Sequence, residues 1–277
     1  MKKIPFFKMN GSGNDFIIIN NRKNIIESTI DMPVEDFVRK VCSRRESIGA
    51  DGLILIEKDE NYDFRWRFFN NDGSEVEMCG NGSRCAARFA FLNGIVPLKM
   101  KFLTLAGVIE AEITGINTVK VQLTKPKNYK EELTLEGIDL PASFIDTGVP
   151  HVVYFVKNVD EVDVKEIGAK TRYHEYFKEE GTNANFAEVV NRNTVKIRTY
   201  ERGVEDETLA CGTGSTAAAV IGVLKGICDS PVAVITRSGK ILKVYVYRTG
   251  GEIDRVYLEG DAMLTYIGTM IDEAWNY

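Results

Sequence analysis

Histidine is nearly missing from this sequence, which has only His151 and His174 among 277 residues. No two cysteines have a Cys-x-x-Cys spacing either, so the usual ligand patterns of a zinc site are absent. We therefore expect no metal cofactor. The sequence also lacks any run of about 18 or more apolar residues, which predicts that no helix spans a membrane and that no membrane is a partner.

Positive charge is not in excess, because 35 Lys and Arg residues stand against 40 Asp and Glu residues, for a net charge of −5. This balance argues against a dedicated nucleic-acid binder. The N-terminal residues are basic but lack the long apolar segment of a secretory signal. Five cysteines form an odd set with no disulfide framework. We therefore expect a cytoplasmic protein with reduced thiols.

What the sequence does have is a repeated motif. Cys-Gly-x-Gly-Ser occurs at Cys79–Ser83 and again at Cys211–Ser215, close to half the chain length apart. Each copy follows an alternating strand-like segment and a short acidic loop. Each leads into an Ala-rich segment that predicts a helix. Because the flanking elements agree in order and spacing, we infer an internal duplication.

The remaining pattern is mostly short apolar segments between turn signals, which predicts many strands and few helices. Beyond the two helices after the motifs, helices are predicted only at Val34–Arg44 and Val164–Tyr173. This composition of elements indicates an α+β fold rather than a doubly wound parallel sheet. A polar, structure-breaking stretch near Leu123–Pro126 predicts the domain boundary.

The chemistry of the motif follows from a cysteine at the start of a helix. Glycines let the backbone turn sharply and approach a ligand closely, and Ser83 and Ser215 are predicted helix caps. The first N–H groups of a helix carry a partial positive charge that favours a bound carboxylate. The same field favours thiolate over thiol and is expected to lower the cysteine pKa. Each copy thus predicts a reactive sulfur beside a carboxylate site.

Two such sulfurs suit stereoinversion at an α-carbon. One thiolate removes the proton from one face, and a thiol returns a proton to the other face. The helix N-termini would hold the substrate carboxylate and stabilise the developing negative charge. Two other interpretations stay open: a thiol redox or sensor protein, and a non-catalytic anion-binding module. Cys42, Cys85 and Cys228 have the pattern of core residues, and no role is predicted for them.

Further motifs extend along essentially the whole chain. They are Lys8–Phe16, Gly49–Gly52, Phe69–Ser74, Met78–Gly82, Pro150-His151, Asn183–Phe186, Tyr200–Gly203 and Ala210–Gly214. In this set the chain resembles the diaminopimelate epimerases, cofactor-independent two-cysteine enzymes. The resemblance implies interconversion of LL- and meso-2,6-diaminopimelate, in lysine and peptidoglycan precursor synthesis, without pyridoxal phosphate or metal.

The resemblance also implies an architecture. It predicts two pseudo-symmetric domains, each a strongly curved, mostly antiparallel sheet wrapped round a central helix, with the active site in the interdomain cleft. The first domain would comprise residues 1–123 plus 264–277 and carry Cys79. The second would comprise residues 124–263 and carry Cys211. A homodimer is expected.

The site residues that the resemblance implies fall into three groups. Cys79 and Cys211 would be the acid and base, and His151 and Glu201 match positions that tune the cysteines. The positions that match substrate-binding residues are Asn14, Asn70, Gly80, Asn81, Asn183, Glu201, Arg202, Gly212 and Thr213.

One position departs from the family pattern. Many relatives have an asparagine directly before the Pro-His pair, whereas this chain has Val149, whose side chain forms no hydrogen bond. A lost neutral hydrogen bond is worth about 1 kcal/mol, which is enough to shift specificity without abolishing recognition. A racemase of the same fold with another amino acid as substrate therefore remains an alternative.

Overall fold

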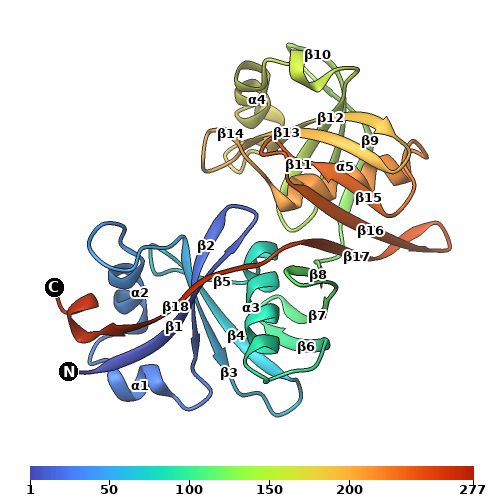
Figure 1. Ribbon diagram of the computed structural model, residues 1–277. Helices are drawn as coiled ribbons and strands as arrows, with labels where there is room; N and C mark the ends of the chain where they lie inside the picture. Colours follow the sequence, from blue (N-terminus) through green and yellow to red (C-terminus); the bar gives the residue numbers. More distant parts are fainter. The chain divides into compact units, whose positions relative to one another are not determined.

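The computed structural model describes residues 1–277, and the chain divides into two units (Figure 1). Unit 1 comprises Met1–Val121 and Gly260–Tyr277, and unit 2 comprises Gln122–Glu259. The sequence prediction puts these crossings at 123/124 and 263/264. Both units consist mainly of strands with few helices, so the predicted α+β fold class is confirmed. None of the helices is both long and apolar enough to cross a membrane.

Unit 1 contains a curved sheet in the spatial order β18-β1-β2-β3-β4-β6-β7-β8. The strands are β1 (Lys3–Gly11), β2 (Asn14–Asn20), β3 (Gly52–Glu57), β4 (Phe64–Asn70), β5 (Glu75–Val76), β6 (Lys99–Thr104), β7 (Gly107–Ile113), β8 (Thr118–Gln122) and β18 (Met263–Ile271). The helices are α1 (Ile25–Thr29), α2 (Val34–Cys42) and α3 (Gly80–Leu92). The central helix α3 packs against β1, β2, β3 and β7.

Unit 2 repeats this plan in the spatial order β9-β10-β11-β12-β13-β15-β16-β17. The strands are β9 (Lys127–Leu135), β10 (Ile138–Asp146), β11 (Pro150–Phe155), β12 (Asn183–Asn191), β13 (Thr194–Glu201), β14 (Asp206–Thr208), β15 (Val232–Ile235), β16 (Ile241–Thr249) and β17 (Glu252–Asp261). The helices are α4 (Val164–Arg172) and α5 (Gly212–Leu224). Figure 1 shows α5 among the strands of unit 2, and it packs against β10, β11, β12, β13, β15 and β16.

The duplication extends to strand direction. Unit 1 has two parallel pairs, β2–β3 and β4–β6, and unit 2 has parallel pairs at the equivalent places, β11–β12 and β13–β15. The other neighbours in both sheets are antiparallel. Short strands β5 and β14 pair with β4 and β13 directly before each cysteine motif. Equivalent connections therefore deliver each motif to the start of its central helix.

The composition of the central helices follows from their surroundings. A helix enclosed by a curved sheet meets strands around most of its circumference, so large side chains do not fit on most faces. In α5, Ala217, Ala218 and Ala219 have no exposed surface. Ala86 and Ala87 of α3 are buried to the same extent. The Ala-rich segments noted in the sequence are therefore the parts of each helix that the strands enclose.

Six strands and one α-helix were not predicted. Strand β9 has the sequence KNYKEELTL, and only its last part buries apolar side chains, so its alternation is weak. Strand β1 contains Pro5, which usually marks an interruption in a strand pattern. Strands β10 and β18, the short strands β5 and β14 in the predicted acidic loops, and the five-residue α1 also went unrecognised. These elements take their structure from pairing with neighbours rather than from their own pattern.

We predict that truncating Trp275 weakens unit 1. This side chain is 1% exposed and meets the Phe37 ring edge to face, with ring centroids 5.5 Å apart. Trp275→Ala is expected to lower the free energy of unfolding by about 3–5 kcal/mol, because it removes a large buried ring. Trp66, the other tryptophan, also lies in unit 1 and is the fluorescence reporter during denaturation in guanidinium chloride.

The matched control is Ile116→Ala, because Ile116 is 94% exposed. It is expected to change stability by less than about 0.5 kcal/mol. Equal unfolding midpoints for the two variants would contradict the assignment of Trp275 to the core.

Candidate functional site

Each motif cysteine is the residue immediately before a central helix. The Sγ atom of Cys79 accepts a hydrogen bond from the Gly82 N–H at 3.4 Å, and Cys211 Sγ accepts one from the Gly214 N–H at 3.4 Å. Both cysteines have extended backbone angles, as capping residues do. The sulfurs therefore occupy the position that a serine or aspartate oxygen usually fills.

The predicted caps at Ser83 and Ser215 are wrong. Both serines lie inside the first turn and have no exposed surface. The reason is that the glycines after each cysteine adopt helical conformation, so the helices begin at Gly80 and Gly212. The consequence is that the N–H groups of the first turn, which have no acceptor within the helix, lie beside sulfur.

The expected lowering of the thiol pKa is also reversed in this structure. Burial raises the pKa of Cys79, and the Gly82 and Asn81 N–H groups oppose that rise. Burial, followed by the negative charge of Glu201, raises the pKa of Cys211 to about 12, against the Thr213 hydroxyl and the helix N–H groups. Desolvation thus outweighs the helix field at both sulfurs.

Two predicted substrate-binding asparagines meet near the start of α3. The Asn81 amide N–H donates to Asn14 Oδ1 at 2.6 Å, and the Asn14 amide donates to Asp51 Oδ2 at 3.1 Å. Asp51 in turn pairs with Arg44, with 2.9 Å between Oδ1 and Nη2. A series of side-chain contacts therefore fixes Asn14 next to the first motif.

Asn70 lies at the end of β4, in the turn before the first motif. Its N–H donates to the Ser74 carbonyl at 2.9 Å, and its amide nitrogen is 3.5 Å from the Ser74 hydroxyl. Gly73 closes this turn with a φ of 84°, and a Cβ there would lie 2.6 Å from the Glu35 carbonyl oxygen. The turn therefore needs glycine, and it directs β4 into the cysteine motif.

Glu201 lies against the second cysteine. Its carboxylate accepts a hydrogen bond from the Thr208 hydroxyl at 2.9 Å. Burial raises the pKa of this carboxyl, and hydrogen bonds from Thr208 and the Cys211 thiol oppose the rise. The Thr213 hydroxyl also lies 3.4 Å from Cys211 Sγ. Cys211 is therefore surrounded by hydrogen-bonding oxygen atoms, one of them acidic.

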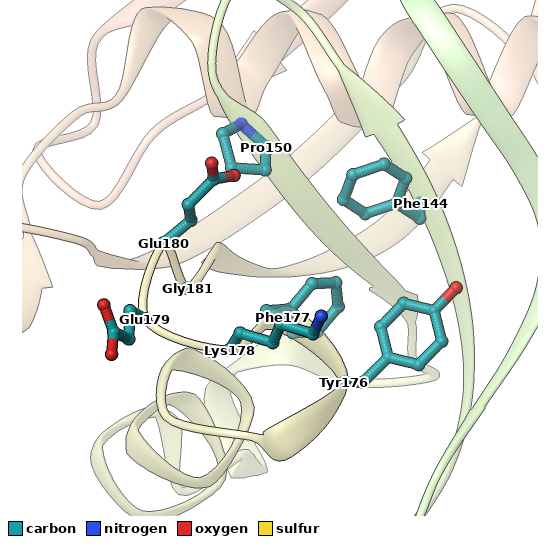
Figure 2. Close-up of a pocket in the computed structure, with 8 residues that line it drawn as sticks. All are labelled: Phe144, Pro150, Tyr176, Phe177, Lys178, Glu179, Glu180 and Gly181. Carbon is teal, nitrogen blue, oxygen red and sulfur yellow. The ribbon is translucent and has the colours of Figure 1, made fainter.

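Asn183 and Arg202 are joined through the backbone. Asn183 Oδ1 accepts a hydrogen bond from the Arg202 N–H at 2.9 Å, and its amide donates to the Pro150 carbonyl at 3.0 Å. The Arg202 guanidinium donates to the Glu180 carbonyl at 2.9 Å. Two of these partners, Pro150 and Glu180, also line a pocket in unit 2 with Phe144, Tyr176, Phe177, Lys178, Glu179 and Gly181 (Figure 2). Neither cysteine lines this pocket, which adjoins the contacts of Arg202.

His151 is fully buried on β11 and belongs to a hydrogen-bond network. The Asn185 amide donates to His151 Nδ1 at 3.0 Å, and Asn185 Oδ1 accepts from the Thr199 hydroxyl at 3.0 Å. Burial lowers the pKa of His151 to about 3, so the ring is neutral. A Cβ at Gly214 would lie 2.3 Å from Asn185 Oδ1, so only glycine lets α5 begin this close to the network.

The position of the family departure, Val149, lies in the turn before β11. Its carbonyl accepts a hydrogen bond from the Thr147 N–H at 3.1 Å. The Thr147 hydroxyl donates to the Thr213 carbonyl at 3.2 Å. This turn is therefore attached to the second motif through Thr147, without a side-chain hydrogen bond from Val149.

Two residues in these networks were not assigned a role from the sequence. Asn185 lies two positions after Asn183 on a buried strand, and an Asn-x-Asn pair in an apolar context was the available signal. Arg84 follows the first motif in a mostly apolar helix and is completely buried. An arginine where the second motif has Thr216 was the available signal there.

Comparisons with known proteins agree along the whole chain. The family model described as diaminopimelate epimerase matches residues 6–129 and 143–265. A diaminopimelate epimerase from Aquifex aeolicus is 49% identical, covering 99% of this chain and 100% of its own. One from Hydrogenobaculum sp. is 47% identical, covering 95% of this chain and 97% of its own.

Solved structures with low sequence identity share the fold. A phenazine biosynthesis protein of the PhzF family from Bacillus anthracis aligns with a TM-score of 0.72 at 18% identity, over 98% of this chain and 100% of its own. A hydroxyproline epimerase from Agrobacterium vitis aligns with a TM-score of 0.67 at 13% identity, over 99% of this chain and 94% of its own. At these identities the likeness concerns the architecture alone.

We predict that His151 makes stability depend on pH. Its folded pKa of about 3 lies below the ordinary value of 6.5, so folding favours the neutral ring. This contribution is complete above about pH 6.5 and is lost as the pH falls toward 3. Relative to His151→Gln, the wild-type free energy of unfolding should fall by up to about 1.4 kcal/mol per pH unit in that window.

The measurement is urea denaturation followed by circular dichroism at several pH values between about 5 and 7. This range is chosen because the histidine of the unfolded chain has a pKa of about 6.5. His174→Gln is the control, because it removes the other histidine. Parallel stability curves for wild type and His151→Gln would contradict the prediction.

Proposed function

The chain belongs to the diaminopimelate epimerase family, and we propose that it interconverts LL- and meso-2,6-diaminopimelate by proton transfer at the α-carbon. It is an isomerase, as the members of that family are named. The observation that carries the proposal is the pair of equivalent helix starts, each with a cysteine sulfur that accepts a hydrogen bond from a first-turn N–H group. No pyridoxal phosphate or metal takes part in the proposed reaction.

In the proposed mechanism Cys79 and Cys211 act on opposite faces of one α-carbon. The thiolate of one cysteine takes the α-proton, and the thiol of the other delivers a proton to the opposite face. No electrons are gained or lost, and the two sulfurs exchange protonation states in each turnover. The raised pKa of a buried thiol supports this role, because the corresponding thiolate is a stronger base toward a weakly acidic C–H bond.

The carbanion needs stabilisation as the proton leaves. Its charge spreads onto the α-carboxylate, which we assign to the backbone N–H groups of Gly80, Asn81, Gly212 and Thr213. These groups lie in the first turn of a helix, where N–H groups lack internal acceptors and the helix field favours negative charge. Such preorganised donors are usually the largest contribution to lowering this kind of barrier.

Glu201 and His151 are assigned supporting roles. The Glu201 carboxyl beside the Cys211 thiol favours its protonated form, which suits Cys211 to proton donation. His151 is a neutral member of the network that ends at Asn185 and the start of α5. We assign to it the orientation of the second motif rather than a proton transfer.

Polar side chains near the two cysteine motifs would bind the charged ends of the substrate. We assign the distal carboxylate to Arg202, whose guanidinium forms two parallel hydrogen bonds with such a group. Asn183 fixes the Arg202 backbone, which supports that assignment. Glu201 also matches a position for an ammonium group, and Asn14, Asn70 and Asn81 supply further amide contacts.

A second candidate is a racemase of the same fold that acts on another amino acid. Val149 favours it, because this side chain removes a hydrogen bond that many relatives direct to the substrate. A panel of amino acids tested under identical conditions separates the two functions. We further propose that the protein acts in the cytoplasm and supplies meso-diaminopimelate to lysine and peptidoglycan precursor synthesis.

The test of the main proposal is incubation with LL-diaminopimelate in deuterated buffer. We expect meso product with deuterium at the α-carbon. Cys79→Ala and Cys211→Ala should each lower the rate by about 10²- to 10⁴-fold, the range expected for removing an acid or base. Cys228→Ala, which removes another buried thiol, is the control.

Undiminished activity in both motif variants would rule out the two-cysteine mechanism. Activity that requires a Cys79–Cys211 disulfide would instead support the thiol redox interpretation. Anion binding without turnover would support the interpretation as a non-catalytic anion-binding module.

We also propose a homodimer that associates through β18. This strand pairs with β1 along one side and exposes Met263, Tyr266 and Ile267, which are 40%, 45% and 61% accessible. Exposed apolar side chains on a strand at a sheet margin favour pairing with a second copy, and a lysine there opposes it. Ile267→Lys should therefore shift the sedimentation coefficient from dimer toward monomer. Ile116→Lys is the exposed control, and an unchanged dimer in both variants would contradict this interface.

A further inference from the structure

Arg84 is a fully buried cation four residues into α3. Its Nε donates to the Asp261 carbonyl at 3.1 Å, and its Nη1 donates to the Gly80 carbonyl at 3.3 Å. Its Nη2 donates to Ser12 Oγ and to Asn81 Oδ1, each at 2.8 Å. The acceptors of these four hydrogen bonds are two carbonyls, a hydroxyl and an amide oxygen, all of them uncharged.

Burying a guanidinium among uncharged partners is energetically unfavourable for a contact that only stabilises local structure. Removing a cation from water is unfavourable by several kcal/mol unless an anion compensates for it. The Asp261 carboxylate also favours the Arg84 cation electrostatically, and Ser12 links the two, because its hydroxyl is 2.7 Å from Asp261 Oδ1. The negative charge of a Cys79 thiolate interacts favourably with the guanidinium, and this interaction opposes the effect of burial on Cys79.

The contact with Gly80 connects Arg84 to the proposed carboxylate site. The carbonyl that accepts from Nη1 belongs to the Gly80–Asn81 peptide, whose N–H is that of Asn81. A cation on a peptide oxygen polarises the group and strengthens its N–H as a donor. The second contact fixes the Asn81 side chain, which in turn holds Asn14. One guanidinium thus orients both the backbone and the side chain of Asn81.

The second half has a neutral residue at the equivalent position. Thr216 also lies five residues after its motif cysteine, and its hydroxyl donates to the Gly212 carbonyl at 2.9 Å. The same peptide is therefore engaged in both halves, in unit 2 by an ordinary threonine contact to the preceding helical turn. The charges differ, because a cation lies near Cys79 while the Glu201 carboxyl lies near Cys211.

We propose that Arg84 is a positioning residue for the epimerase reaction, which orients and polarises the Gly80–Asn81 peptide and supplies a buried positive charge that favours the Cys79 thiolate. This inference rests on the proposed function. Arg84 thus favours the thiolate at Cys79, whereas the Glu201 carboxyl favours the thiol at Cys211.

The decisive experiment measures each thiolate separately and needs no substrate. Iodoacetamide labelling of the reduced protein across a pH series, followed by peptide mass spectrometry, gives a labelling midpoint for each cysteine. Arg84→Met should raise the Cys79 midpoint by about one pH unit or more, because an opposite charge has been removed. Arg84→Lys should stay near wild type, and the Cys211 midpoint should not move in either variant.

Turnover gives the second readout. Arg84→Met should lower kcat by about 10- to 100-fold with a smaller change in KM, since a weakened oxyanion donor acts mainly in the transition state. Arg84→Lys keeps the charge, but its single ammonium group does not reproduce the fork that reaches Gly80 and Asn81. It should therefore retain the Cys79 midpoint while kcat falls. If Arg84→Met does not fold, Arg84→Lys still decides the positioning role, because an unchanged kcat would overturn it.

The matched control is Arg88→Met, one turn further along α3. Arg88 donates to the Ile116 carbonyl at 3.1 Å and the Ala262 carbonyl at 2.7 Å, both outside the motif. It should leave both midpoints and kcat unchanged. A Cys79 midpoint that stays fixed in Arg84→Met, or moves equally in Arg88→Met, would overturn the proposal. Wild-type protein that fails to epimerise diaminopimelate would instead contradict the proposed function, and the labelling midpoints would still test Arg84.

Discussion

The hydrogen bond from a helical N–H to a cysteine sulfur is the constraint on which the rest of each unit depends. For Cys79 and Cys211 to cap α3 and α5, a strand must end where the helix begins, and glycines must follow the sulfur. The short strands β5 and β14 make that approach, and the enclosing strands bury the alanines in the middle of each helix completely. Each unit thus positions one cysteine sulfur at the start of its central helix, and the duplication provides two such sulfurs.

The two units share the same backbone arrangement but differ in the charged residues near their cysteines. Strand order, parallel pairs and helix starts are equivalent in the two units, yet Arg84 occupies one half and Glu201 the other. Two identical sulfurs would have no reason to differ in protonation. The Arg84 cation and the Glu201 carboxyl act on the thiol pKa values in opposite directions, which suits a reaction that needs one base and one acid.

Much of this arrangement was predictable from the sequence, because repeated motifs fix local backbone. The Cys-Gly-x-Gly copies indicated both the duplication and the helix starts to within a few residues. The direction of the thiol pKa shift was not predictable, since it depends on how completely strands from distant sequence cover Cys211. The roles of Arg84 and Asn185 were hidden for the same reason. Strand β9 was missed because only Leu133 and Leu135 near its end are buried, while the rest of its sequence is polar and pairs with β10 through the backbone.

The alanines of the central helices have an entropic consequence. Ala217, Ala218 and Ala219 have no side-chain rotamers, so the segment that follows Cys211 has almost no side-chain entropy to lose or regain. The packing of α5 against β10, β11, β12, β13, β15 and β16 therefore fixes the helix that carries the sulfur without any side chain having to be ordered at these three positions.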